Sequence, residues 1–301
     1  MNSWNFKYIV IEVIILEHFG EIFRNLRKSN NMSMSQVVGK EFSVATLSSF
    51  EKGNSMLTID KFYYILEKIG ITIEEFEYIA NGHDFNQFYQ LANKLSTYYN
   101  ENNEFALKKL LSGTKSEITD TDPKSTMNYL MIKSVLSQFD ASYLLTEKEA
   151  LITSDYLFSL DEWSYYQLIL YSNTIKSFTF ETIDSLSREL LQRASFYKAI
   201  PRNKKLIIEI LLNTTIVLAE HKKSHYTKFF RNAIRELLVN ETMIYEKTVF
   251  LFICGFIDFQ DGKIDKGKSK MQDAIDVLNK VGSYHLAKSY QEDYDKVVGK
   301  N

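Results

Sequence analysis

The side chains best suited to chemistry lie on one short stretch of the chain, SVATLSSFEKG at residues 43–53. Three apolar residues recur at intervals of three and so share one face of a helix: Val44, Leu47 and Phe50. Three small residues point away from that face: Ala45, Thr46 and Ser49. Ser43 is a favourable N-cap and Gly53 a favourable residue just past a helix end, which predicts a short helix. A short helix with small polar groups on its outer face fits the major groove of DNA.

Other arrangements of reactive side chains give little support to catalysis. His221 and His225 stand four residues apart, close enough on a helix to share a metal ion, but no third ligand is near and the neighbouring lysines would repel a cation. We therefore interpret both as surface residues. The sequence has no Gly-rich phosphate loop, no Gly-x-Ser-x-Gly elbow and no Cys-x-x-Cys pair. We expect no catalytic residue, no metal site and no cofactor, and hence no enzyme.

Length and composition are those of a soluble globular protein. The chain has 301 residues, 45% of them hydrophobic and 25% charged, which is enough for two domains with a large core. The net charge is −2, so any nucleic-acid binding must come from a local basic patch. Cys254 is the only cysteine; its apolar neighbours predict a buried, inert thiol, and its isolation suits a reducing cytosol.

The first 17 residues, MNSWNFKYIVIEVIILE, are apolar but too short to span a bilayer, and Glu12 and Glu17 would be costly in lipid. They lack the basic start and the cleavage site of a signal peptide. Two interpretations remain: an additional packing segment, or a translated leader from an upstream start chosen in error. We favour the second, because the pattern that carries the motif begins only at Phe19. We predict no membrane partner.

Five short helices are predicted within residues 18–81. Capping boxes open two of them, Ser33 with Gln36 and Thr72 with Glu75. The predicted ranges are 19–30, 33–38, 43–52, 58–69 and 72–79. Longer amphipathic helices follow, and no stretch shows sustained β alternation. Their predicted ranges are 84–99, 101–112, 123–139, 146–158, 161–176, 179–199, 202–220, 223–239, 242–261, 263–280 and 283–298.

A chain of paired helices with short turns is typical of an α-solenoid. Gly255, Gly267 and Ala274 are spaced by 12 and 7 residues, which matches the small positions of the tetratricopeptide repeat, where two helices cross closely. We therefore predict an all-α fold in three parts. They are an N-terminal extension (1–17), a small helix-turn-helix bundle (18–81) and a solenoid of tetratricopeptide-like helical repeats for regulation and dimerisation (82–301).

The sequence also carries a family resemblance. Residues 19–80 resemble the Cro/repressor-type helix-turn-helix domain through FGEIFRNLRKSNNMS, TLSSFEKGN and LEKIGITIEEF. WSYYQLILYSN (163–173) and ILLN (210–213) resemble the Rgg/GadR/MutR family of Gram-positive regulators, so that the resemblance spans roughly residues 19–298. It implies a cytoplasmic, homodimeric transcription regulator of double-stranded operator DNA. In many members a short imported peptide pheromone controls activity, which is quorum sensing.

The resemblance implies that four residues face the DNA groove: Ser43, Ala45, Thr46 and Ser49. Hydroxyl groups can reach base edges or phosphates, and the Ala45 or Thr46 methyl can contact a thymine methyl. Family members often have Gln in place of Thr46 and Arg in place of Ser49, so direct base readout is expected to be weak here.

Contacts to the DNA backbone are assigned to Arg24 and Lys52. Residues 18–70 contain seven Lys and Arg against five Asp and Glu, a modest excess for a phosphate-binding domain. We expect Arg27 to pair instead with Glu51 inside the domain, as a structural ion pair between the first and third helices.

Asn173 and Asn213 each lie in an otherwise apolar and aromatic helix, where an amide must find hydrogen-bond partners. Taken alone, each amide fits a bond to a neighbouring helix in the core. With the resemblance, we expect both to bind the backbone of a short peptide, with Tyr165 and Tyr166 lining apolar pockets beside it.

Two alternatives stay open at this point. One is a regulator of the same fold without a peptide ligand. The other is a protein-interaction module whose helix-turn-helix serves assembly rather than DNA binding.

Overall fold

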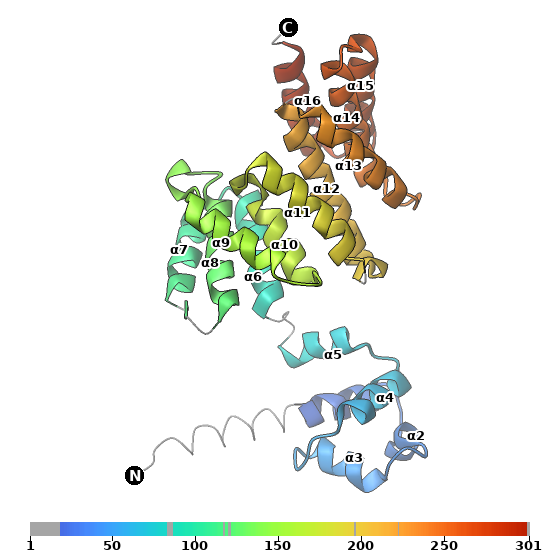
Figure 1. Ribbon diagram of the computed structural model, residues 1–301. Helices are drawn as coiled ribbons and strands as arrows, with labels where there is room; N and C mark the ends of the chain where they lie inside the picture. Colours follow the sequence, from blue (N-terminus) through green and yellow to red (C-terminus); the bar gives the residue numbers. More distant parts are fainter. Residues whose placement is uncertain are drawn as a thin grey trace. The chain divides into compact units, whose positions relative to one another are not determined.

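The computed structural model describes residues 19–82, 87–116, 118–119, 122–195, 197–221 and 223–299. These residues form helices and no β-strand; the one extended pairing among them is an isolated bridge between Thr119 and Asp122. The predicted all-α fold is thus confirmed. The predicted extension at 1–17 lies outside the described residues. The chain divides into two compact units, Met1–Lys94 and Leu95–Asn301 (Figure 1). That division falls inside α6 (Gln87–Asn100), so the domain boundary predicted after residue 81 stays a prediction.

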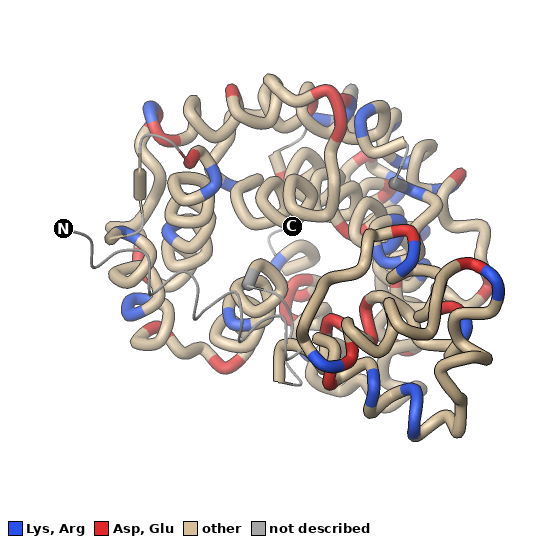
Figure 2. The backbone as a smooth tube through the Cα atoms, turned by 90° about the horizontal axis from the view of Figure 1, so that it is seen from below, with Lys and Arg blue, Asp and Glu red and all other residues tan. Residues whose placement is uncertain are grey.

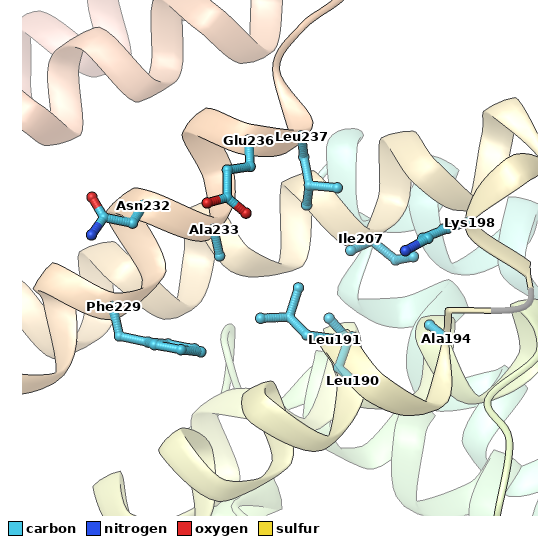
Figure 3. Close-up of a pocket in the computed structure, with 10 residues that line it drawn as sticks. All are labelled: Leu190, Leu191, Ala194, Lys198, Ile207, Phe229, Asn232, Ala233, Glu236 and Leu237. Atoms are coloured by element: carbon cyan, nitrogen blue, oxygen red, sulfur yellow. The ribbon is translucent and has the colours of Figure 1, made fainter.

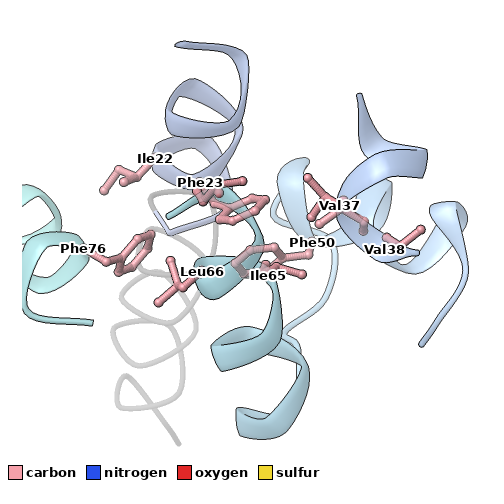
Figure 4. Packing of buried hydrophobic residues seen from close by; sticks show 10 residues of the cluster. Ile22, Phe23, Val37, Val38, Phe50, Ile65, Leu66 and Phe76 are labelled. Atoms are coloured by element: carbon pink, nitrogen blue, oxygen red, sulfur yellow. The ribbon is translucent and has the colours of Figure 1, made fainter. Parts of the chain in front are cut away.

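In the first unit, a helix at 19–29 is followed by α2 (Met34–Val38), α3 (Val44–Glu51), α4 (Ile59–Ile69) and α5 (Ile73–Ala80). Both predicted capping boxes are present, at the starts of α2 and α5. The apolar faces meet in a single cluster (Figure 4). Its buried members are Ile22, Phe23, Val37, Val38, Leu47, Phe50, Ile65, Leu66, Ile69 and Phe76. Burial of this cluster holds α3 against the other helices of the bundle.

The first helix and the end of α3 approach each other unusually closely at Gly20. A Cβ atom at this position would overlap the carbonyl oxygen of Phe50 and come within 3.2 Å of the Cα of Glu51. Any side chain larger than hydrogen would therefore push the two helices apart. Glycine at position 20 therefore allows this close contact between the first helix and the end of α3.

The second unit is built from helices stacked in chain order (Figure 1). Its α-helices are α7 (Glu104–Lys115), α8 (Pro123–Leu136), α9 (Glu147–Phe158), α10 (Tyr165–Thr174), α11 (Phe180–Arg193), α12 (Pro201–Glu220), α13 (Ser224–Leu237), α14 (Ile244–Gln260), α15 (Ile264–Lys280) and α16 (Tyr284–Val298). Short 3-10 turns lie at Ala141–Tyr143 (η1), Ile175–Ser177 (η2) and Tyr197–Ala199 (η3). In one layer α8 packs against α10, α10 against α12 and α12 against α14. In a second layer α9 packs against α11, and Arg188 of α11 stacks on Phe229 of α13, while α15 packs on α14.

One predicted helix, 179–199, is shorter than expected. Its counterpart α11 ends at Arg193. The Arg193 guanidinium donates hydrogen bonds to the carbonyl oxygens of Phe158 and Leu160, and the Arg193 carbonyl accepts one from the Trp163 backbone nitrogen at 3.1 Å. These contacts join residues more than 29 positions apart in sequence and use the backbone group that would have continued the helix. Helical periodicity alone cannot indicate them.

The crossing of α14 and α15 has the close approach that the repeat-like spacing predicted. A Cβ atom at Gly255 would lie 2.8 Å from the carbonyl oxygen of Gly267 and 2.8 Å from the backbone nitrogen of Met271. One at Gly267 would lie 2.5 Å from the backbone nitrogen of Phe259. Ala274, one turn beyond Met271, is buried. Because the nearest atoms belong to the backbone, neither helix can give way locally.

We predict that Gly255→Ala destabilises the second unit by about 1–3 kcal/mol, because the added methyl overpacks a crossing of two backbones. Urea unfolding followed by far-UV circular dichroism and by the fluorescence of buried Trp163 measures the effect. Gly113→Ala is the matched control: Gly113 lies within α7 with no atom near its Cβ position, so alanine should stabilise by about 0.5–1 kcal/mol. Equal effects of the two substitutions would contradict the close crossing.

Candidate functional sites

The predicted recognition helix is α3, and its start is built as the sequence suggested. Ser43 is the N-cap, and its Oγ accepts a hydrogen bond from the Thr46 backbone nitrogen at 3.1 Å. The hydroxyls of Ser43 and Thr46 also bond to each other at 2.9 Å. Of the three apolar residues on one face of this helix, Leu47 and Phe50 are buried and Val44 is 43% exposed. The chain enters α3 at Val44, so this first-turn residue sits at the edge of the core and not over it.

The four predicted groove-facing residues differ in exposure. Ser43 and Ala45 are exposed, whereas Thr46 and Ser49 are half-buried. The Ser49 hydroxyl accepts a hydrogen bond from the Ser55 hydroxyl at 2.9 Å, which ties it to the loop after α3. The outer face of α3 therefore offers few free donors and acceptors to base edges.

Basic side chains around α3 are scattered. Arg24 and Lys52, the residues assigned to the DNA backbone, are both exposed, as are Lys28 and Lys40. Figure 2 shows Lys and Arg positions interspersed with Asp and Glu along the chain. Along the described part of the first unit the basic residues are interspersed with acidic ones, so their charge is spread along the chain and not gathered in one stretch.

Arg27 and Glu51 are brought together inside the first unit. Arg27 Nε donates to Glu51 Oε1 at 2.6 Å and a terminal guanidinium nitrogen donates to Oε2 at 2.8 Å, while the other terminal nitrogen donates to the Met32 carbonyl at 2.7 Å. Both residues are less than 7% exposed. The hydrogen bond to Glu51 raises the pKa of Arg27. A bidentate pair satisfied on all sides fixes the end of α3 to the first helix, and removing one partner of such a pair costs about 3–5 kcal/mol.

The predicted peptide-binding asparagines lie on neighbouring helices of one layer. Asn173, near the end of α10, is half-buried and donates from its amide nitrogen to the Ile169 carbonyl at 2.8 Å. This bond lies within its own helix and leaves the amide oxygen able to accept. Asn213, in the middle of α12, is exposed. Neither amide is used to join its helix to a neighbour among the hydrogen bonds of the described residues.

The two amides lie within about one helical turn of each other along their helices. Tyr165 and Arg202, at the starts of α10 and α12, are in contact, with the guanidinium carbon 5.2 Å from the ring centroid. Asn173 follows Tyr165 by eight residues and Asn213 follows Arg202 by eleven, so their axial positions differ by about 5 Å at 1.5 Å per residue. Adjacent helices pack about 8–10 Å apart. We call the surface that bears these residues the receptor face: Tyr165, Tyr166, Asn173, Arg202, Glu209 and Asn213.

The two tyrosines of the receptor face each contact a neighbouring helix. Tyr166 donates from its hydroxyl to Asn128 Oδ1 on α8 at 3.0 Å, and Lys124 Nζ lies 5.6 Å from its ring centroid. Tyr165 lies under Arg202, as described. Burial raises the pKa of both hydroxyls, so both stay neutral at physiological pH. Their rings give the receptor face rigid apolar walls.

Charged residues that the sequence analysis missed lie beside Asn213. Lys205 Nζ is 3.9 Å from a Glu209 oxygen on α12 and 3.8 Å from a Glu246 oxygen on α14. Burial raises the pKa of the Glu209 carboxyl, opposed by Lys205 and reinforced by Glu246. Glu209 stands one helical turn before Asn213. The spacing of four residues between Lys205 and Glu209 on one helix could have indicated the first of these contacts. Nothing in the sequence indicated the contact with Glu246 on α14.

A buried chain of hydroxyl groups lies beneath the receptor face and links the helices that carry it. Tyr171 on α10 donates to the Ile183 carbonyl at 3.1 Å and bonds to the Ser187 hydroxyl on α11 at 2.7 Å. Ser187 in turn bonds to the Thr214 hydroxyl on α12 at 2.9 Å. All three side chains are fully buried. Tyr171 precedes Asn173 by two residues and Thr214 follows Asn213 directly, so this chain fixes the two helices that carry the amides.

Two histidines and one cysteine were the other candidates in the sequence. His221 packs against Phe180 and lies 2.9 Å from the Val217 carbonyl, while the side chain of His225 lies outside what the structure describes. Cys254 is buried as expected, and burial raises its pKa. Within the described ranges, no three His, Cys, Asp or Glu residues gather as a metal site would require. No described helix has the length and apolar character to cross a bilayer.

A helix-turn-helix bundle and a layered unit of helical repeats in one chain define a class of protein, the transcription regulator with an attached receptor unit. A family model described as the HTH-type transcriptional regulator Rgg, C-terminal domain, matches residues 107–292. This match covers more than half of the chain, which therefore belongs to the Rgg family of transcription regulators. The resemblance seen in the sequence is thus confirmed.

Solved structures agree with this assignment. The chain is similar to the SHP pheromone receptor Rgg2 of Streptococcus dysgalactiae, with 28% identity, a TM-score of 0.81, and 92% of this chain and 99% of that one covered. A Listeria monocytogenes protein matches with 20% identity, a TM-score of 0.82 and coverage of 95% and 98%. The PrgX/cCF10 complex matches with 14% identity, a TM-score of 0.70 and coverage of 94% and 93%. The last two show the fold alone.

We predict that Tyr171→Phe lowers the free energy of unfolding of the second unit by about 1–3 kcal/mol, because the buried Ile183 carbonyl and Ser187 hydroxyl of α11 each lose their hydrogen bond to α10. Tyr284→Phe is the matched control: Tyr284 is 70% exposed, and its change should stay within about 0.5 kcal/mol. Thermal and urea unfolding report both values. A Tyr171→Phe protein as stable as the control would show that the hydroxyl chain does not hold these helices.

Proposed function

We propose that this Rgg-family regulator is a cytoplasmic homodimer that binds double-stranded operator DNA through α3 and is gated by a short peptide pheromone on the receptor face. The observation that carries the peptide proposal is the pair of amides of Asn173 and Asn213, which lie on adjacent helices within about one helical turn of each other and have acceptor or donor capacity to spare. Similarity to a pheromone receptor, Rgg2, supports the same reading.

The spacing of the amides suits an extended peptide. An extended chain advances about 3.3 Å per residue, so helices about 10 Å apart meet peptide groups about three residues apart. An amide both donates and accepts, and can bond to a peptide backbone without selecting its side chains. The rings of Tyr165 and Tyr166 then provide apolar contact beside the backbone. Selectivity would come from these walls and from the charges of Arg202 and Glu209.

Gating requires the peptide to prefer one arrangement of the dimer. A dimer of this kind places two recognition helices about 34 Å apart, one turn of DNA, on a roughly palindromic operator. Peptide binding changes DNA affinity only if it favours one helix spacing over another, because a ligand with equal affinity for both states shifts neither. The helices α10 and α12 carry the binding groups and are the elements through which such a preference would act.

We predict that Asn173→Ala combined with Asn213→Ala abolishes the capture of peptide while leaving the fold intact. The protein is purified from its own host under native conditions, and the peptides it releases on denaturation are identified by mass spectrometry. Because Asn213 is exposed and Asn173 bonds only within its helix, stability should change by less than about 1 kcal/mol. Asn279→Ala, at an exposed position of α15, is the control and should retain the peptide. If the wild type releases no peptide, or the double variant releases as much, the receptor proposal fails.

We predict that Arg24→Ala and Lys52→Ala each weaken binding to duplex DNA from the region upstream of the gene. Each should also reduce the slope of log affinity against log salt concentration by about 1, the effect of one lost phosphate contact. Lys266→Ala, an exposed residue of α15, should change neither quantity. Fluorescence anisotropy over a range of salt concentrations measures the slopes. Unchanged slopes for both first-unit variants would exclude these residues from the DNA interface.

A further inference from the structure

A pocket of about 320 Å³ opens on the second layer, between α11, the start of α12 and α13 (Figure 3). Ile207 reaches it from α12. Glu209 of the receptor face follows two residues later and so points to nearly the opposite side of the helix. The pocket is therefore separate from the proposed peptide site. Its volume is at the lower end of the range for small-molecule sites. A ligand that fills it can be no larger than a short peptide of a few residues.

The lining of the pocket is apolar. Leu190, Ala194 and Ile207 form a floor that is at most 3% exposed. Leu191, Phe229 and Ala233 stand above it, and Figure 3 shows the side chains of Leu191 and Phe229 directed toward each other. A ligand must therefore have an apolar body to gain from entering.

One wall of the pocket is fixed before any ligand arrives. Phe229 is 40% exposed, but the Arg188 guanidinium stacks 4.0 Å from its ring centroid. Arg188 is itself held by Asp184, whose two oxygens each accept from Nε at 3.0 Å. A preformed wall saves the entropy of ordering a side chain on binding.

Two opposite charges stand at the rim. Lys198 lies in η3 and Glu236 in the last turn of α13, and both are exposed. Neither forms an ion pair with another residue of the described ranges. Because they come from separate elements, they suit a ligand with charges at its two ends more than one with a single charged head. A ligand of complementary charge therefore has an ammonium group near Glu236 and a carboxylate near Lys198.

We propose that this pocket binds a short apolar peptide of two or three residues in zwitterionic form. Its side chains fill the space over Leu190 and Ile207, its terminal ammonium pairs with Glu236, and its terminal carboxylate pairs with Lys198. The site is independent of the receptor face, and its test does not depend on pheromone binding.

Saturation-transfer-difference NMR on the full chain tests the proposal, with the dipeptide Leu-Leu as probe. Leu-Leu should give saturation transfer at about 10 mM or below, and Gly-Gly, which has both charges but no apolar body, should give none. N-acetyl-Leu-Leu lacks the ammonium and Leu-Leu-amide lacks the carboxylate, so each should bind about two- to fivefold more weakly, the effect of one exposed ion pair.

Variants assign each end of the ligand. Lys198→Ala should weaken Leu-Leu about two- to fivefold without changing Leu-Leu-amide, and Glu236→Gln should weaken Leu-Leu without changing N-acetyl-Leu-Leu. Ala233→Phe should fill the pocket and remove binding, with circular dichroism confirming the fold. Lys288→Ala and Glu292→Gln, exposed on α16, are the matched controls and should bind as the wild type does. No transfer from Leu-Leu, equal binding of all three leucine ligands, or undiminished binding by a folded Ala233→Phe protein would overturn the proposal.

Discussion

The Tyr171 hydroxyl links the helices of the second unit that carry the receptor face. It lies fully buried where α10, α11 and α12 meet, and it joins them through Ser187 and Thr214. A buried polar chain is stabilising only when every member has a partner, so these helices tolerate little sliding. That constraint fixes Asn173 on α10 and Asn213 on α12 relative to each other, while the apolar pocket with Ile207 lies on a different side of α12.

In the first unit, a buried ion pair and a close contact between two helices play a comparable role. The Arg27–Glu51 pair fixes the end of α3, and glycine at position 20 lets the first helix approach it. The outer face of α3 nevertheless offers few free polar groups, because Thr46 and Ser49 are half-buried and Ser49 is bonded to Ser55. We therefore expect phosphate contacts, DNA shape and the spacing of two recognition helices to carry much of the operator specificity.

Much of the fold could be predicted because its signals are local. Ser33, Thr72 and Pro123 mark helix starts through their nearest neighbours, and the spacing of Gly255 and Gly267 indicates a close crossing. What could not be predicted depends on distant partners. The early end of α11 and the Lys205 contact to Glu246 arise only once the helices have packed, and the Ser49–Ser55 bond depends on the path of the loop after α3. The residues of the candidate site could be named from the sequence. Their relative positions on α10 and α12 came from the structure.

We propose that this chain recognises discrete operators under the control of a peptide. Chromatin immunoprecipitation of the tagged protein in its own host tests it most directly, with the export of small peptides intact or blocked. The account predicts a few sharply occupied sites, each roughly palindromic with half-sites about one turn of DNA apart, and an occupancy that changes when export is blocked. Occupancy spread evenly along the genome, or discrete sites indifferent to peptide export, would contradict it.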